Sequence, residues 1–143
     1  MSRGRLLVGL LVCIATVTIA LAGGPEVVVI ASPTVADEVL SYNAVRLIFG
    51  MRLRNWRNGD AIRVYTLRDD DPVHAQFCRT MIGVYPHQLR LAWDRLVFSG
   101  TGQAPVELAS VGEMLERVAS TPGAVGYLPG NAVDARVRVL RTE

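Results

Sequence analysis

Short apolar runs separated by turn residues predict four strands in the part of the chain after residue 25. The β-branched run in Glu26–Ala31 predicts a buried strand, and Ala61–Leu67 alternates apolar and polar residues as a half-buried strand does. Two shorter runs, Ala124–Leu128 and Val137–Leu140, lie between turn residues near the end of the chain. We therefore expect these four segments to form the sheet of the protein.

Four further segments repeat apolar residues every three or four positions, which predicts helices. The expected helices cover residues 37–49, 72–83, 86–98 and 106–120. Asp71 and Pro72 mark one start clearly, because aspartate caps a helix and proline is favoured at its first position. The residues expected on the apolar face of the third helix are Leu89, Trp93, Leu96 and Val97. The order of these elements predicts an α/β fold, with helices packed on a mixed, mostly parallel sheet.

The segment Leu47–Asp60 connects the first expected helix to the second expected strand and carries a tryptophan. Gly50 is expected to end the helix, and Asn58-Gly59 is expected to form a tight turn before the strand. Trp56 lies between these two points. Its ring either fills a gap in a small core or forms the wall of a cleft, and the sequence leaves both alternatives open.

The first 22 residues have the features of a secretory signal peptide. Arg3 and Arg5 precede a long apolar run that ends in Ala20-Leu21-Ala22, and small residues in this arrangement are typical of a cleavage site. The alternative is a membrane anchor, but the run is near the short limit for crossing a bilayer. We therefore expect residues 1–22 to be a cleaved signal peptide. Residues 23–143 are then one exported, periplasmic domain, with no membrane span left after cleavage.

The charges of the chain balance once residues 1–22 are removed. The remaining part has 13 arginines and 13 acidic residues, and the sequence contains no lysine. Without an excess of positive charge, a nucleic acid is not an expected partner. Cys78 is the only cysteine left in the exported part, which predicts a buried structural thiol and no intrachain disulfide.

The sequence contains no recognisable catalytic or metal-binding motif. His74 and His87 lie in different expected helices, and His74 is expected to be solvated on a helix face. The run Asp69-Asp70-Asp71 could suggest a cation site, but a calcium loop needs ligands spread over about a dozen residues. Asp71 is better explained as the cap of the helix that follows. We therefore expect no enzymatic activity, no cofactor and no metal.

The stretch Thr121–Tyr127 combines two glycines with a short apolar strand. Gly123 and Gly126 flank the start of this strand, and Tyr127 follows directly. Such glycines indicate either tight packing of the strand against its neighbours or a backbone that lines a ligand cleft. The sequence alone does not separate these two interpretations.

Several motifs, in the same order, resemble periplasmic phosphate-binding proteins. They are Ile48-Phe49-Gly50, Trp56 with Gly59, Phe77, Trp93, Phe98-Ser99-Gly100 with Gly102 and Pro105, and Thr121–Tyr127. The exported part is similar over essentially its whole length to the small phosphate ABC transporter substrate-binding-like members of this family. The resemblance implies a type II periplasmic-binding-protein fold, and the chain is long enough for about one lobe. In this pattern Ile48 and Phe49 pack the core, and Trp56 packs at the lobe edge.

The resemblance also implies a function, namely the binding of phosphate or another small anion in partnership with an ABC permease. The ligand contacts that it suggests are Ser32, Thr34, Arg68 and Tyr127. Larger relatives hold phosphate through an arginine followed by Ser-Gly-Thr at a helix N-terminus. In the matching stretch of this chain, Arg68–Val73, the arginine is retained and Asp71-Pro72-Val73 replaces Ser-Gly-Thr. Carboxylates there repel an anion, so we expect weak binding or binding with a partner. The alternative function is a periplasmic interaction or sensory module that docks on a membrane sensor or transporter.

Overall fold

The structure is a computed structural model, and it describes residues 25–143. The expected signal peptide, residues 1–22, lies outside the described residues. Within residues 25–143 the chain forms six strands and four α-helices, with one π-helical and one 3-10 turn. The strands are β1 (Val27–Ala31), β2 (Val39–Leu40), β3 (Arg63–Leu67), β4 (Val106–Leu108), β5 (Ala124–Pro129) and β6 (Arg138–Thr142). The helices are α1 (Tyr42–Phe49), α2 (Pro72–Phe77, continued by the π-helical turn Cys78–Ile82), α3 (Pro86–Phe98) and α4 (Val111–Ser120).

The six strands form one mixed sheet in the order β2-β6-β1-β5-β3-β4. Among the strand pairings of residues 25–143, β2–β6, β3–β4 and β3–β5 are parallel, and β1–β5 and β1–β6 are antiparallel. The predicted α/β fold with a mixed sheet is therefore confirmed. Because β1 is antiparallel to β5 and β5 is parallel to β3, β1 runs in the opposite direction to β3.

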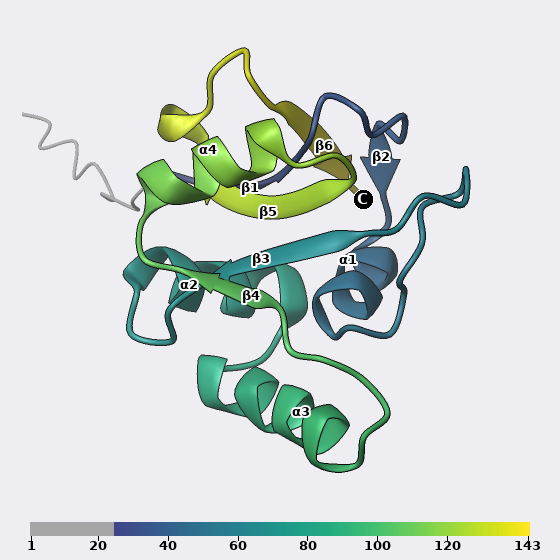
Figure 1. Cartoon of the computed structure of the whole chain (residues 1–143). Helices are drawn as coiled ribbons and strands as arrows, with labels where there is room; N and C mark the ends of the chain where they lie inside the picture. The colour runs from purple at the N-terminus through teal and green to yellow at the C-terminus, as the bar shows by residue number, and fades with distance from the viewer. Residues whose placement is uncertain (1–24) are drawn as a thin grey trace, which may run out of the picture.

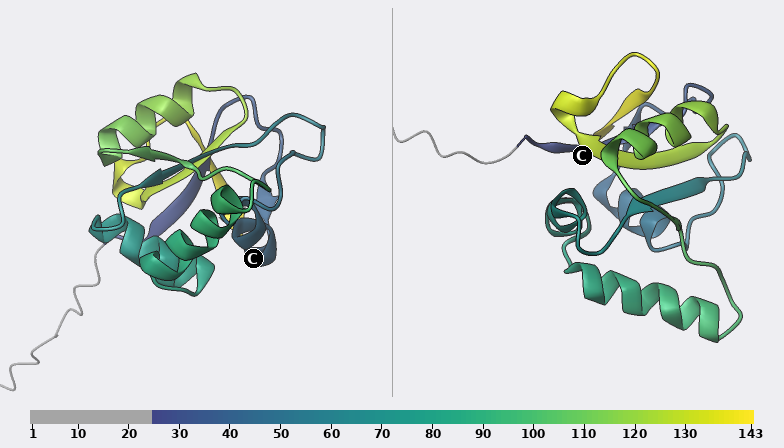
Figure 2. Two further views of the ribbon diagram at one scale, coloured as in Figure 1. Left: turned by 60° about the horizontal axis from the view of Figure 1, so that its bottom comes forward. Right: turned by 60° about the vertical axis from the view of Figure 1, so that its left-hand side comes forward.

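Helices cover both faces of the sheet (Figure 1). Helix α4 lies on one face, and α1 and α2 lie on the other, while α3 is further out than α1 and α2 (Figure 1, Figure 2). The loop that leaves α3 leads to the edge strand β4 (Figure 1). Within residues 25–143, no helix has the length and apolar character needed to cross a membrane.

The first helix is shorter than predicted. It begins at Tyr42, because the Ser41 side chain caps it by accepting a hydrogen bond from the backbone N–H of Ala44 at 3.1 Å. The preceding Val39 and Leu40 form β2, which pairs in parallel with Arg141 and Thr142. The pairing of β2 with β6, about a hundred residues further along the chain, therefore replaces the helix that the local pattern predicts at residues 39 and 40.

The last helix is also shorter than predicted, and for the same kind of reason. Val106–Leu108 pairs in parallel with β3 and forms an edge strand instead of a first helical turn. The helix begins after Ser110, whose hydroxyl accepts a hydrogen bond from the N–H of Glu113 at 3.1 Å. The short edge strand depends on its distant partner strand, which the local sequence does not reveal.

The expected core residues of the segment Leu47–Asp60 are buried as predicted. Ile48 and Phe49 are fully buried. Trp56 is 6% exposed, and its Nε1 donates a hydrogen bond to the carbonyl of Gly123 at 3.0 Å. The tryptophan therefore ties the loop after α1 to the turn that precedes β5.

Helix α3 packs inward mainly through two residues. Leu89 and Trp93 are buried, and Trp93 Nε1 donates to the carbonyl of Phe49 at 2.8 Å. The prediction that Val97 shares this face is wrong, because Val97 is largely exposed. Four residues advance an α-helix by about 40° beyond a full turn, so Val97 lies at the margin of the face that Leu89 and Trp93 define.

We predict that Gly123→Ala destabilises the fold strongly. Gly123 has a φ of 72°, and a Cβ atom there would lie 2.4 Å from the carbonyl oxygen of Ala61. The substitution adds backbone strain and a clash with backbone, which together cost about 3 kcal/mol. Urea unfolding measures the change in the free energy of unfolding.

Gly59→Ala is the matched control for this substitution. Gly59 also has a positive φ, 93°, but no atom lies within 4 Å of an added Cβ. Only the backbone strain remains there, at about 1 kcal/mol. Equal destabilisation by the two substitutions would contradict the close packing of the Gly123 turn.

Candidate functional site

Arg68 lies at the end of the sheet where ligands bind in many open α/β folds. It follows the last residue of β3, and α2 begins four residues later. The Arg68 side chain is exposed and forms an ion pair with Asp70 at 3.1 Å. Asp71 caps α2 as predicted, because its carboxylate accepts a hydrogen bond from the N–H of Val73 at 2.8 Å. The helix terminus that could bind an anion therefore already has a carboxylate bound to it.

A shallow cavity of about 320 Å³ lies beside Arg68. We call its lining residues the Arg68–Arg90 cluster, which comprises Arg68, Asp69, Asp70, Arg90 and Glu107. The Arg90 guanidinium binds both oxygens of Asp69, at 2.8 and 3.0 Å, and Glu107 at 2.7 Å. These bonds join α3, the loop after β3 and the edge strand β4. Three carboxylates face two guanidinium groups, so the cluster has a negative formal charge.

The hydrogen bonds between Arg90 and Asp69 shift the pKa values of both groups. The hydrogen bond from Arg90 is the main reason that the pKa of Asp69 lies below its ordinary value. The same hydrogen bond raises the pKa of Arg90, because it stabilises the charged guanidinium. Both groups are therefore charged at neutral pH, and each already has a charged partner before any ligand arrives.

Tyr127 lies underneath this cluster, inside the core. It is fully buried and stacks on Phe77 with a distance of 3.9 Å between ring centroids. Its hydroxyl accepts a hydrogen bond from the N–H of Leu67 at 2.8 Å and is also bonded to Nδ1 of His74. Burial raises the pKa of Tyr127, so the phenol is neutral at neutral pH. Tyr127 as a ligand contact stays a prediction, and the structure gives its hydroxyl two partners within the protein.

His74 is buried, and the prediction that it is solvated is wrong. Its Nε2 lies 3.5 Å from Cys78 Sγ and 3.8 Å from Asp69 Oδ1. A nearby carboxylate favours the proton on Nε2, so Nδ1 accepts a hydrogen bond from the Tyr127 hydroxyl. Burial lowers the pKa of His74, which is neutral in this position. The spacing of His74, Phe77, Cys78 and Met81, all buried, is the helical pattern that could have revealed it.

Cys78 is buried as predicted, and its contact with His74 does not make a reactive pair. Burial raises the pKa of the thiol to about 12. The thiol is therefore protonated at neutral pH, whereas nucleophilic cysteines need a lowered pKa and access to the substrate. Among residues 25–143, no group of three or more His, Cys, Asp or Glu side chains is arranged to hold a metal ion.

Ser32 and Thr34 lie at the opposite end of the sheet from Arg68. Ser32 Oγ and Thr34 Oγ1 are 3.1 Å apart, and Thr34 Oγ1 accepts a hydrogen bond from the N–H of Gly123 at 3.0 Å. Because β1 is antiparallel to β5 and β5 is parallel to β3, the end of β1 lies beside the start of β3. The four predicted ligand contacts are therefore not brought together around one ligand.

The glycines of Thr121–Tyr127 are explained by close packing. A Cβ at Gly126 would lie 2.5 Å from Met114 Sδ, because α4 packs directly on β5. Gly123 approaches the backbone of Ala61 equally closely. Of the two interpretations left open by the sequence, the structure supports tight packing of the strand.

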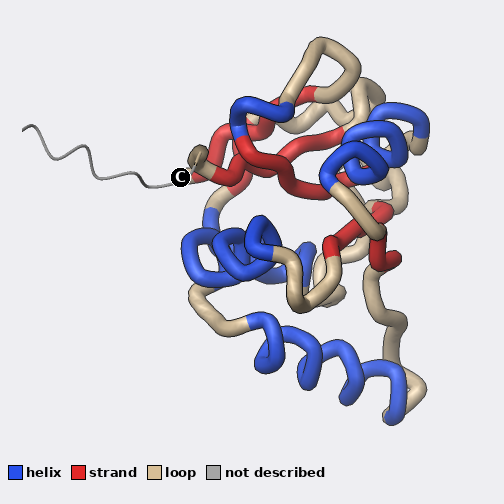
Figure 3. The backbone as a smooth tube through the Cα atoms, turned by 90° about the vertical axis from the view of Figure 1, so that its left-hand side faces the viewer, coloured by secondary structure: helices blue, strands red, loops and turns tan. Residues whose placement is uncertain are grey.

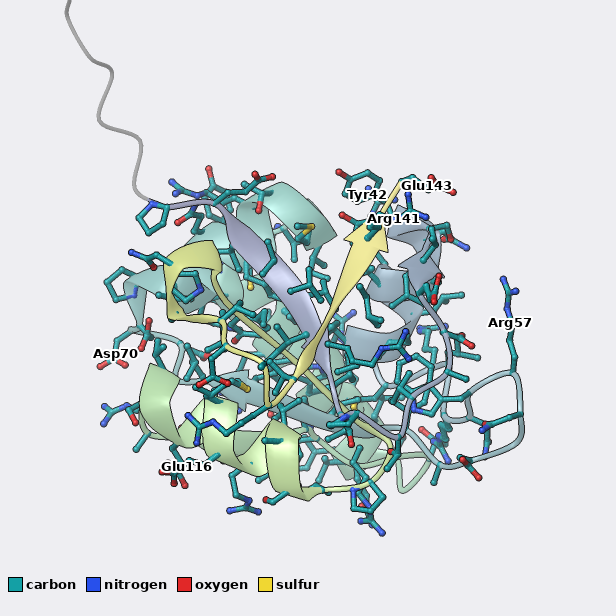
Figure 4. The ribbon with its side chains drawn as sticks, turned by 90° about the horizontal axis from the view of Figure 1, so that it is seen from above. Tyr42, Arg57, Asp70, Glu116, Arg141 and Glu143 are labelled. Carbon is teal, nitrogen blue, oxygen red and sulfur yellow. The ribbon has the colours of Figure 1, made fainter. Side chains whose placement is uncertain are left out.

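A cavity of about 690 Å³ lies beside Trp56. Its lining comes from the segment Ala36–Ser41, the inner face of α1, the loop 53–57 and Glu143. Trp56 is thus both a buried residue and part of a cavity wall, so the two alternatives for its ring are compatible. Figure 4 shows that Arg57, in this loop, and Asp70, in the Arg68–Arg90 cluster, lie on opposite sides of the molecule.

Comparisons with known proteins give matches only among solved structures. No family model matches the sequence, and no curated protein gives a significant match. An ABC-type phosphate transport receptor from Vibrio cholerae has a TM-score of 0.65 at 15% identity. A Clostridium perfringens protein described as a phosphate ABC transporter substrate-binding protein, solved with bound phosphate, has a TM-score of 0.65 at 17% identity. PstS from Borrelia burgdorferi has a TM-score of 0.63 at 15% identity.

These matches confirm, at the level of the fold, the resemblance to phosphate ABC transporter substrate-binding proteins. They cover 82%, 82% and 83% of this chain, but only 46%, 45% and 47% of the three solved proteins. The chain thus spans less than half the length of the solved proteins that it matches. It has a solute-binding-like fold of about one lobe.

We predict that the free energy of unfolding decreases as the pH falls below 6.5. Burial lowers the pKa of His74 from its ordinary value of 6.5, so the unfolded chain binds a proton that the folded chain does not. This contribution to stability is complete above pH 6.5 and is lost as the pH falls from 6.5 towards the lower pKa of the folded state. Urea unfolding at pH 7.5 and pH 5.5 measures the difference.

His74→Gln is the control for this pH dependence. The variant is less stable than the wild type, but it lacks the titrating imidazole, so its stability changes less between the two pH values. Asp69 contributes at lower pH, because its pKa is already below 3.8. An identical pH dependence in wild type and variant would show that His74 is not the group responsible.

Proposed function

We propose that this chain is an exported, periplasmic solute-binding-type protein that binds phosphate or another small anion weakly, or more tightly with a partner. The single observation that carries the proposal is the position of Arg68. It is an exposed cation at the carboxyl end of β3, beside a cavity, in a fold shared with proteins described as phosphate-binding. An ABC permease is the partner class that such a protein serves.

The charges around Arg68 support weak binding by the isolated chain. The exposed guanidinium of Arg68 forms an ion pair with Asp70, and the guanidinium of Arg90 forms ion pairs with Asp69 and Glu107. An anion must displace these partners and approach carboxylates, which costs about 1 kcal/mol for each unit charge at 4 Å in water and more where water is excluded. A second chain that supplied further donors would offset this cost.

We propose a binding role and not a catalytic one. The Cys78–His74 contact is enclosed in the core, and its thiol remains protonated at neutral pH. A base and a nucleophile must both reach the substrate to act on it. The solved proteins with the same fold are described as transport receptors and substrate-binding proteins.

The alternative function, a periplasmic interaction module that docks on a membrane sensor or transporter, is favoured by one observation. Phe98, Tyr85 and Leu91, which lie in or next to α3, are among the most exposed large apolar residues of the described part. An exposed aromatic and aliphatic surface of this kind is typical of a protein interface. The two functions are compatible, because solute-binding proteins act through other proteins.

We predict that phosphate binds with a Kd in the millimolar range, about −4 kcal/mol, and that Asp70→Asn strengthens binding about fivefold. The substitution frees Arg68 from its ion pair and removes one negative charge. Arg68→Ala removes the binding. Isothermal titration calorimetry with inorganic phosphate measures these affinities on protein purified after expression and export of the full chain.

Asp60→Asn and Arg57→Ala are the matched controls. Both residues are exposed. Arg57 lies on the far side of the molecule from Asp70 (Figure 4), and Asp60 follows it three residues later, so neither substitution should change the affinity. A flat titration with phosphate for both the wild type and Asp70→Asn, repeated with arsenate and sulfate, would contradict direct binding of an oxyanion at Arg68.

A further inference from the structure

The outward side of α3 has a surface that the fold does not use. Asp94 and Arg95 are each three or four residues from both Leu91 and Phe98, so these four residues lie on one side of the helix. This side is opposite to Leu89 and Trp93, which pack inward. We call these four residues the outer α3 face. Figure 1 and Figure 3 show α3 as the outermost helix, away from the sheet.

The outer α3 face exposes large apolar side chains. Phe98 is 87% exposed and Leu91 is 52% exposed. An exposed phenylalanine leaves a large apolar area in water, and burying this area against a partner is favourable. A partner that covers Phe98 and Leu91 together would gain from both.

The charges of this face are self-complementary. Asp94 and Arg95 lie between Leu91 and Phe98, and neither forms an ion pair with another residue in the part of the chain that the structure describes. Along the helix the order is therefore apolar, negative, positive, apolar. If a second copy of the helix lies antiparallel, each Asp94 faces an Arg95, and each Leu91 faces a Phe98.

We propose that the outer α3 face binds a second copy of this chain in an antiparallel, two-fold symmetric helix pair. A two-fold interface requires one surface to be complementary to itself, and the order of residues on α3 meets this requirement. The pairing satisfies two opposite charges and covers two exposed apolar side chains in each copy. It needs no change in the fold, because the face is already exposed.

The helix pair also bears on the proposed function, which calls for a partner, and in this respect it deepens that proposal. Arg90 precedes Leu91 on the same helix, and its guanidinium holds Asp69 and Glu107. Pairing through α3 therefore places the Arg68–Arg90 cluster of each copy along the side of the helix pair. Self-association is measured without any anion, so a failure of this proposal is distinguishable from a failure of anion binding.

The test uses charge reversal and sedimentation velocity on protein purified after export of the full chain. The wild type is expected to form a dimer as its concentration rises. Asp94→Arg places an arginine opposite each Arg95, and Arg95→Asp places an aspartate opposite each Asp94. Each variant alone should therefore associate at least about tenfold more weakly than the wild type. The two variants mixed together restore opposite charges at both contacts, and the mixture should form a heterodimer.

Phe98→Asp should abolish the dimer, and Val139→Asp is its matched control. Val139 is 47% exposed on β6, away from α3, so its substitution should leave the dimer unchanged. Circular dichroism confirms that each variant is folded. A wild type that stays monomeric at all concentrations, a mixture that does not associate, or equal effects of Phe98→Asp and Val139→Asp would each overturn the proposal.

Discussion

The structure depends on the buried hydroxyl of Tyr127, which joins three elements that local sequence cannot bring together. Tyr127 lies in the central strand β5. Its hydroxyl accepts a hydrogen bond from the N–H of Leu67 at the end of β3, and it is also hydrogen-bonded to His74 in α2. The ring completes the junction by stacking on Phe77 and contacting Phe49. Leaving either polar partner unsatisfied in this dry core would cost about 1–3 kcal/mol. The end of β3, and with it the position of Arg68, is therefore fixed from inside the protein.

The exposed side of the same junction is governed by charge. Asp71 caps α2, Asp70 pairs with Arg68, and Arg90 is held between Asp69 and Glu107. These bonds connect the loop after β3 with α3 and β4, so residues that could receive an anion also hold the fold together. The consequence is a fold of solute-binding type in which the two arginines at the carboxyl end of β3 are already paired with carboxylates of the same chain.

The sequence predicts the parts of this fold that local chemistry determines. The Asp71-Pro72 helix start, the buried Ile48 and Phe49, and the α/β class with a mixed sheet are all confirmed. The short strands β2 and β4 were missed, because each forms only through a distant partner strand. For the site, Arg68 is found where a ligand could reach it, but Ser32 and Thr34 lie at the other end of the sheet. That separation follows from the antiparallel pairing of β1 with β5, which no local pattern reveals. His74 was misplaced because its polarity outweighed its helical spacing with Phe77 and Cys78.

The central claim, that Tyr127 fixes the Arg68 end of the sheet from inside, is tested most directly by amide hydrogen exchange. The measurement compares Tyr127→Phe with the wild type under native conditions. In the wild type the Leu67 amide should exchange only through global unfolding, because its hydrogen bond is buried. In Tyr127→Phe the amides of Leu67 and of the loop that follows should exchange much faster, while the paired amides of β1 keep their protection relative to global stability. Unchanged protection at Leu67, or a uniform loss of protection across β1 and β3 alike, would contradict the account.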